Sequence, residues 1–269
     1  MTNITAKNYR KLVIRLSLNG FSYCIFDTLE NKPLRIDSVD FSSLPKSARV
    51  EELYVQAFQD IKEFSETYDN VIALHDNSLN TFVPQALFDE EYMGSYLQYN
   101  TKVFETDFFA FDELTNYEIN HIYIPYVNIN NLLIDQFGSF DYRHSNTVLV
   151  SRLLDKSKNI DDKQVFVHFD TACFQVVVAQ NQKLLLFNSF DFSTKEDFIY
   201  YLLFKAEQLH LNPETVKVIL SGRISEESEL YQIAYKYVRH VSLHDISDLK
   251  SQTGLTETEC RQHFIILQA

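Results

Sequence analysis

The sequence predicts an α/β fold built from two related halves, each with a mixed five-stranded sheet flanked by helices. Three short strands end in Asp40-Phe41-Ser42, and three more end in Asp191-Phe192-Ser193, 191 − 40 = 151 positions later. A long amphipathic helix follows each set. Hydrophobic residues make up 45% of the 269 residues, enough for a core in both halves. A repeat of this length indicates two copies of one domain.

Alternating apolar residues predict a hairpin at the start of the first half. Its strands, 11–18 and 21–25, are joined at Asn19-Gly20, because Asn-Gly supplies the two positive φ angles of a type I′ turn. A turn at residues 31–33 leads into a third strand, 34–41. Apolar residues at helical spacing then predict a helix over 47–68. A buried strand over 70–75 completes the first copy.

Residues 82–159 are extra material that the second half lacks. Its pattern predicts a helix over 86–99, strands over 102–111 and 118–125, and helices over 130–137 and 146–156. The polar stretch 156–163 is the natural boundary. We therefore expect a first lobe over 1–160, with an inserted subdomain around 82–145, and a second lobe over 161–269.

The second half repeats the order of the first. Strands at 165–169 and 174–178 flank a turn near Asp170-Thr171, and Asn181-Gln182 leads into a third strand, 184–190. Ser193-Thr194-Lys195-Glu196 is a capping-box pattern that opens a helix, which Asn212-Pro213 ends. A buried strand over 216–220, a helix over 226–237 and a closing strand over 264–267 follow.

Charge and composition exclude several classes of protein. The net charge is −13 and no basic run stands out, which disfavours binding to nucleic acid or to anionic membranes. No apolar stretch is long enough to span a membrane or to act as a signal peptide. Cys24, Cys173 and Cys260 lie far apart and indicate reduced structural thiols. We therefore expect an acidic cytoplasmic protein.

The order of elements resembles the actin-like ATPase superfold of sugar kinases, heat-shock chaperone ATPases and actin. The chain is similar in layout to the bacterial cell-division, type IV pilus and type II secretion actin-like proteins. More closely, it resembles an uncharacterised bacterial family with that fold. The resemblance implies two actin-like (ribonuclease H-like) lobes around a cleft. It also implies phosphate-binding loops at the first hairpin of each lobe and an adenosine loop after a buried strand.

All three loops depart from the pattern that the resemblance implies. A phosphate cradle needs glycines, so that backbone N–H groups can approach the phosphate. The first loop is Asn19-Gly20 without an acidic residue in the Asp-x-Gly position, and the second is Asp170-Thr171-Ala172 with Ala for Gly. The adenosine loop reads Ser221-Gly222-Arg223, with one glycine in place of two. The candidate nucleotide-binding residues are Asn19, Gly20, Asp170, Thr171, Ser221 and Gly222.

Other motifs favour structural interpretations. His240 and His244 lack the Glu of a zinc helix and no cysteine cluster supports them, so we predict no metal site. Arg223 is expected to pair with Glu226 and Glu227. The aromatic stretch 104–111 is expected to be a buried strand, although exposed rings there would mark a partner surface. No Gly-x-Ser-x-Gly nucleophile elbow is present.

We therefore expect a non-catalytic actin-like protein that binds a protein partner as a cytoplasmic scaffold or regulator, without a cofactor. The alternative is a divergent nucleotide-binding ATPase or kinase-like enzyme that uses ATP and Mg²⁺ in the cleft between the lobes. A third reading is a self-assembling protein, since duplicated domains often form homodimers. The sequence does not identify the partner.

Overall fold

The chain separates into two compact units in the computed structural model, which describes residues 7–42 and 49–269. The first lobe comprises Met1–Glu113, Ile119–Val148 and Ile265–Ala269. The second lobe comprises Leu114–Glu118 and Leu149–Phe264. This division follows spatial compactness, and the 1–160 and 161–269 domains derived from the repeat stay a prediction.

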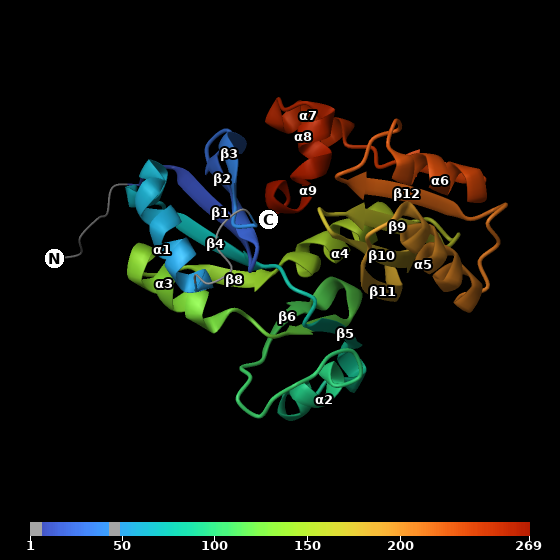
Figure 1. The fold of residues 1–269 in the computed structure, drawn as a ribbon, viewed down its shortest axis with the longest axis horizontal. Helices are drawn as coiled ribbons and strands as arrows, with labels where there is room; N and C mark the ends of the chain where they lie inside the picture. Colours follow the sequence, from blue (N-terminus) through green and yellow to red (C-terminus); the bar gives the residue numbers. More distant parts are fainter. Residues whose placement is uncertain (1–6, 43–48) are drawn as a thin grey trace. The chain divides into compact units, whose positions relative to one another are not determined.

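A mixed five-stranded sheet forms the centre of the first lobe (Figure 1). Its strand order is β3-β2-β1-β4-β8. The hairpin strands β1 and β2 are antiparallel, whereas β4 runs parallel to both β1 and β8. The bounds are β1 (Arg10–Ser17), β2 (Gly20–Asp27), β3 (Lys32–Asp40), β4 (Asn70–His75) and β8 (Asp141–His144).

The second lobe has a sheet of the same design. Its order, β11-β10-β9-β12-β13, repeats that of the first lobe strand for strand, with the same parallel and antiparallel pairings. The segments around Ile14 in β1 and around Phe166 in β9 hold equivalent places in their sheets. The duplication predicted from the sequence is confirmed. The bounds are β9 (Gln164–Phe169), β10 (Cys173–Gln180), β11 (Lys183–Asp191), β12 (Lys217–Gly222) and β13 (His240–Leu243).

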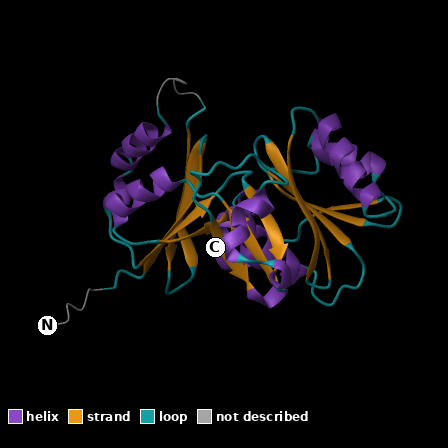
Figure 2. Cartoon of the chain, turned by 90° about the horizontal axis from the view of Figure 1, so that it is seen from below, coloured by secondary structure: helices purple, strands orange, loops and turns teal. Residues whose placement is uncertain are grey.

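Helices cover a face of each sheet and close its core (Figure 2). In the first lobe, α1 (Val50–Asp60) and α3 (Val127–Phe137) pack on apolar residues of β1, β2 and β4. In the second, α5 (Lys195–Gln208) and α6 (Glu229–Tyr237) pack on β9, β10 and β12. Four further helices are α4 (Ser145–Lys156), α7 (Ser247–Thr253), α8 (Glu257–Gln262) and α9 (Phe264–Leu267).

The inserted material in the first lobe forms a small subdomain of its own. Its three-stranded sheet has the order β5-β7-β6, and α2 (Met93–Leu97) packs on it through Leu97. The strands are β5 (Asn80–Pro84), β6 (Ala110–Leu114) and β7 (Ile119–Tyr123). Short 3-10 helices occur at Gln85–Leu87, Glu90–Tyr92 and Thr115–Tyr117.

Several predicted elements are wrong in type or extent. The stretch 102–109 is loop rather than strand, and the helix expected over 86–99 is broken into short turns around α2. The apolar run 264–267 is the helix α9, and the fifth strand of the second sheet is β13 instead. A four-residue apolar run carries no periodicity that separates strand from helix.

The helix predicted over 47–68 is shorter than expected. It ends at Asp60 and gives way to a 3-10 helix at Lys62–Ser65, while residues 47 and 48 lie outside the described residues. Phe58, Ile61 and Phe64 are spaced by three, which is the period of a 3-10 turn. The capping box of α5 exists, but it pairs Thr194 with Asp197 rather than Ser193 with Glu196.

Candidate functional site

The first hairpin bend lies one residue earlier than predicted. Ser17 pairs with Gly20, so the loop residues are Leu18 and Asn19, and neither has a positive φ. The type I′ turn predicted at Asn19-Gly20 is therefore wrong. A two-residue loop with both φ angles positive occurs instead at Asn181-Gln182, between β10 and β11.

Gly20 is required by the neighbouring strand β3. Its φ is +139°, and a Cβ built on it would lie 2.1 Å from the carbonyl oxygen of Val39. The close approach of the two backbones therefore explains this glycine without a phosphate.

The polar groups of the first bend bind one another. The Ser17 hydroxyl donates to the Gly20 carbonyl oxygen (2.8 Å) and accepts from the Asn19 N–H (3.3 Å). The Tyr54 hydroxyl, buried beneath the bend, lies 2.8 Å from the Ser17 carbonyl oxygen and 3.1 Å from that of Gly20. The N–H of Phe41 donates to the Asn19 carbonyl. The bend is thus held by the chain itself.

The second hairpin bend is also closed by its own groups. The Asp170 N–H donates to the Cys173 carbonyl (2.9 Å), and the Thr171 N–H donates to the Asp170 carboxylate (2.9 Å). That carboxylate lies 3.8 Å from the guanidinium of Arg223. Arg223 was expected to pair with Glu226 and Glu227, and the structure pairs it with Asp170 instead. Both contacts involve the same carboxylate oxygen, Oδ1.

The predicted adenosine loop adjoins this bend, because β9 and β12 are parallel neighbours whose ends meet. Gly222 pairs with Phe169, and the Ser221 hydroxyl lies 3.0 Å from His168 Nδ1, both side chains being buried. The structure thus brings Asp170, Thr171, Ser221 and Gly222 together in the second lobe. Asn19 and Gly20 belong to the first lobe.

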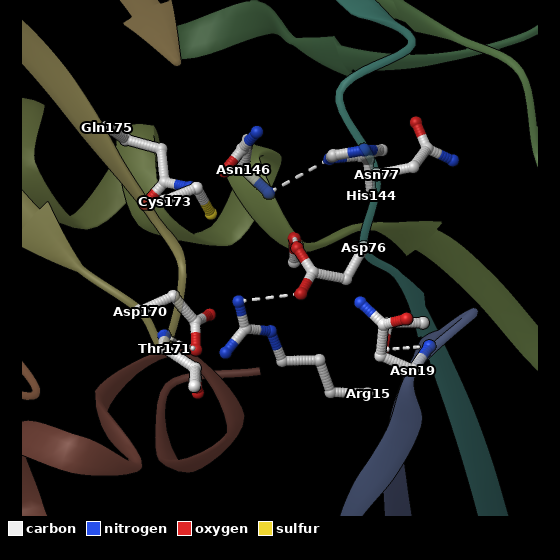
Figure 3. Close-up of polar contacts among 12 residues, drawn as sticks. Arg15, Asn19, Asp76, Asn77, His144, Asn146, Asp170, Thr171, Cys173 and Gln175 are labelled. Atoms are coloured by element: carbon white, nitrogen blue, oxygen red, sulfur yellow. Dashed lines mark hydrogen bonds and ion pairs between the residues drawn. The ribbon is translucent and has the colours of Figure 1, made fainter. Parts of the chain in front are cut away.

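An ion pair that the sequence reasoning missed lies in the first lobe. Arg15 on β1 binds the carboxylate of Asp76, which directly follows β4, at 2.8 Å, and the Ser145 hydroxyl donates to the other oxygen of that carboxylate at 2.7 Å (Figure 3). The sequence does contain a signal for this ion pair. Arg15 is a charged residue within the apolar run 12–16, and a charge in a buried strand needs a partner. Both carboxylate oxygens are therefore engaged.

Buried polar side chains continue from this pair toward the insertion. His75, His121 and His144 are fully buried, and His144 Nδ1 accepts from the Asn146 N–H at 3.1 Å (Figure 3). Burial lowers the pKa of His75 to about 4 and that of His121 to about 3, and it also lowers the pKa of His144 well below its usual value. These imidazoles are neutral at pH 7.

Asp112 on β6 is the carboxylate of this cluster. It accepts from the Tyr123 hydroxyl (3.0 Å), the His144 N–H (2.9 Å) and the Thr147 hydroxyl. Burial raises the pKa of Asp112 above its usual value despite these contacts. Within 7–42 and 49–269, no group of three or more His, Cys, Asp or Glu side chains could hold a metal ion.

Comparison with solved structures assigns the fold to the class of actin-like ATPases. A Bacteroides thetaiotaomicron protein of unknown function with an actin-like ATPase fold matches at TM-score 0.80 and 22% identity, covering 94% of this chain and 98% of that one. A PilM–PilN type IV pilus biogenesis complex matches at TM-score 0.58 and 11% identity, with 96% of each chain covered. The ethanolamine utilization protein EutJ from Carboxydothermus hydrogenoformans matches at 0.50 and 9%, covering 97% and 90%.

The chain belongs to the family described as Protein of unknown function (DUF3822), whose model matches residues 1–241. A comparison with curated proteins found no match. No helix within the described ranges has both the length and the apolar character needed to cross a membrane.

Proposed function

We propose that this chain is a non-catalytic actin-like protein that binds another protein as a cytoplasmic scaffold or regulator. The observation that supports it best is the state of the two hairpin bends. The first is closed by Ser17 and Tyr54, and the second by the contacts of Asp170 with Thr171 and Arg223. Bends closed in this way do not fit a phosphate cradle, so no step of nucleotide hydrolysis is derived for them.

Protein binding agrees with the use of this fold in other proteins. A relative with the same fold, PilM, is described in a complex with PilN. That complex supports a role in which the lobes present a surface rather than turn over a substrate. The competing function is a divergent nucleotide-dependent enzyme. The observation that favours it is the nearness of Asp170 to Ser221 and Gly222, at the neighbouring ends of β9 and β12.

A nucleotide titration separates the two functions. We expect the melting temperature to stay unchanged with 1 mM ATP, ADP or GTP and Mg²⁺, because no preformed site stabilises the folded state. A nucleotide bound at a Kd of about 10 μM would add about 2.7 kcal/mol at that concentration. It would raise the melting temperature by several degrees, which scanning calorimetry detects.

The control uses two acidic positions of the second lobe. A saturable rise in melting temperature that Asp170→Ala abolishes and the exposed Asp162→Ala retains would establish the enzyme or switch instead. Isothermal titration with ATP and Mg²⁺ on the same samples would give the affinity independently of stability.

A further inference from the structure

Two sheet edges border a cleft in the first lobe. β6 is the edge strand of the three-stranded sheet, and β8 is the edge strand of the five-stranded sheet. Consecutive residues of both line a cleft of about 560 Å³, namely 111–113 from β6 and 140–143 at β8, with Thr147 of α4. We call this cleft the β6–β8 slot. The slot thus lies along both edge strands.

Each edge strand has a partner on one side only among the described residues: β7 for β6, and β4 for β8. A strand at a sheet edge presents N–H and C=O groups that an additional strand can bind. Proteins often use such edges to bind an extended segment of a partner. In β8, the N–H of His144 faces the open edge and is already bound by Asp112. Because the backbone groups of alternate strand residues face the same side, Tyr142 is the residue of Asp141–Arg143 that presents its N–H and C=O to this edge.

Asp112 fixes the position of the two strands. Its carboxylate belongs to β6, yet it accepts from the backbone N–H where β8 ends and from Thr147 on α4. The Tyr123 hydroxyl on β7 holds its other oxygen. These contacts join the insertion to the main sheet within one lobe. The slot is therefore preformed, and a bound segment would not need to order it.

The lining of the slot favours a cationic occupant. Glu113 and Asp141 contribute exposed carboxyl groups, against the single guanidinium of Arg143 among the lining residues, while the carboxylate of Asp112 is already bound by its three donors. Three rings, Phe111, Phe140 and Tyr142, supply apolar surface. Phe111 belongs to the aromatic stretch 104–111, which was expected to be a buried strand. Rings beside carboxylates suit lysine and arginine side chains, whose apolar stems pack while their charged ends pair.

We propose that the β6–β8 slot binds an extended segment of a partner protein, which adds as a strand to the edge of β8 and carries lysine or arginine at alternate positions. This inference rests on the proposed protein-binding function and names its partner class. Charged residues on a short edge strand also block unwanted pairing. Asp141 would thus repel acidic strands and accept basic ones.

The test uses fluorescein-labelled ten-residue peptides that alternate lysine with valine, and matched peptides with glutamate for lysine. Fluorescence anisotropy should show saturable binding of the lysine peptide only. Asp141→Lys should weaken it at least about tenfold, because it places like charges together. Asp135→Lys, at an exposed acid on α3, should leave it unchanged.

Backbone methylation separates strand addition from simple charge attraction. N-methylation on alternate residues of the lysine peptide should abolish binding in one register and preserve it in the other, since only one set of N–H groups would face β8. Three results would each overturn the inference. They are equal binding of both methylated peptides, equal loss of affinity in Asp141→Lys and Asp135→Lys, and no binding of the lysine peptide. ATP binding together with intact peptide binding would contradict only the non-catalytic function.

Discussion

Gly222→Ala is expected to destabilise the protein by about 2–5 kcal/mol, because overpacking costs about 1–3 kcal/mol and a positive φ costs a residue with a Cβ about 1–2 kcal/mol. Gly222 has φ +84°, and a Cβ on it would lie 2.1 Å from the carbonyl oxygen of Phe169 and 2.8 Å from its nitrogen. The clash is with backbone in the neighbouring strand β9, which cannot move without breaking the sheet. Urea denaturation followed by circular dichroism measures the loss in the free energy of unfolding.

Gly254→Ala is the matched control in the same lobe. Gly254 also has a positive φ, +72°, but nothing lies within 4 Å of its Cβ position. Only the left-handed backbone is penalised there, by about 1 kcal/mol. Similar losses in the two variants would show that β9 yields to the added methyl group. A larger loss for Gly222→Ala than for Gly254→Ala would indicate that Gly222 is needed for packing against β9 rather than for binding a ligand.

The protein is expected to lose stability steeply as the pH falls from about 6.5 toward 5. The folded state keeps four buried histidines neutral, with pKa values of about 4 for His75 and His244, about 3 for His121 and a lowered value for His144. The unfolded chain takes up protons near pH 6.5. Stability therefore rises with pH through this window.

The expected slope follows from the number of protons. Four histidines that charge only on unfolding give up to about 5 kcal/mol per pH unit, and Asp112, whose pKa is raised by burial, opposes this by at most one proton. Unfolding free energies from pH 5 to 7.5 measure it. His121→Gln should reduce the slope by about 1.4 kcal/mol per pH unit. The exposed His240→Gln should leave it unchanged, and an equal reduction in both variants would contradict this explanation.

Local pattern predicted the long strands well and the short ones poorly. β1, β2, β9 and β10 each bury a continuous or alternating apolar set, so period and turn residues identified them. By contrast, β5, β8 and β13 have four or five residues with several polar side chains. Their strand form depends on a neighbouring strand, which no local sequence window contains.

The residues of the candidate site also divide into those that a local motif reveals and those that only the fold brings together. The sequence singled out Asp170 and Gly222 as candidates, because missing or isolated glycines are visible in a motif, and their role in binding stays a prediction. It gave no hint that Tyr54 seals the first bend, since that residue fits an ordinary helical stripe. Arg15 and Asp76 lie 61 positions apart, and only the parallel pairing of β1 with β4 brings them together. Such partners follow from topology rather than from spacing.

The insertion changes how much chain entropy each edge pairing must overcome. β4 is followed by 65 residues (76–140) before its partner β8, whereas β12 is followed by 17 (223–239) before β13. By the logarithmic law of loop closure, the longer connection opposes pairing by about 1 kcal/mol more. The internal order of the insertion, tied down through Asp112, offsets that difference. The two sheets therefore differ in one respect. The pairing of β8 relies on the contacts of Asp112 in the insertion, whereas β13 follows β12 after a short connection.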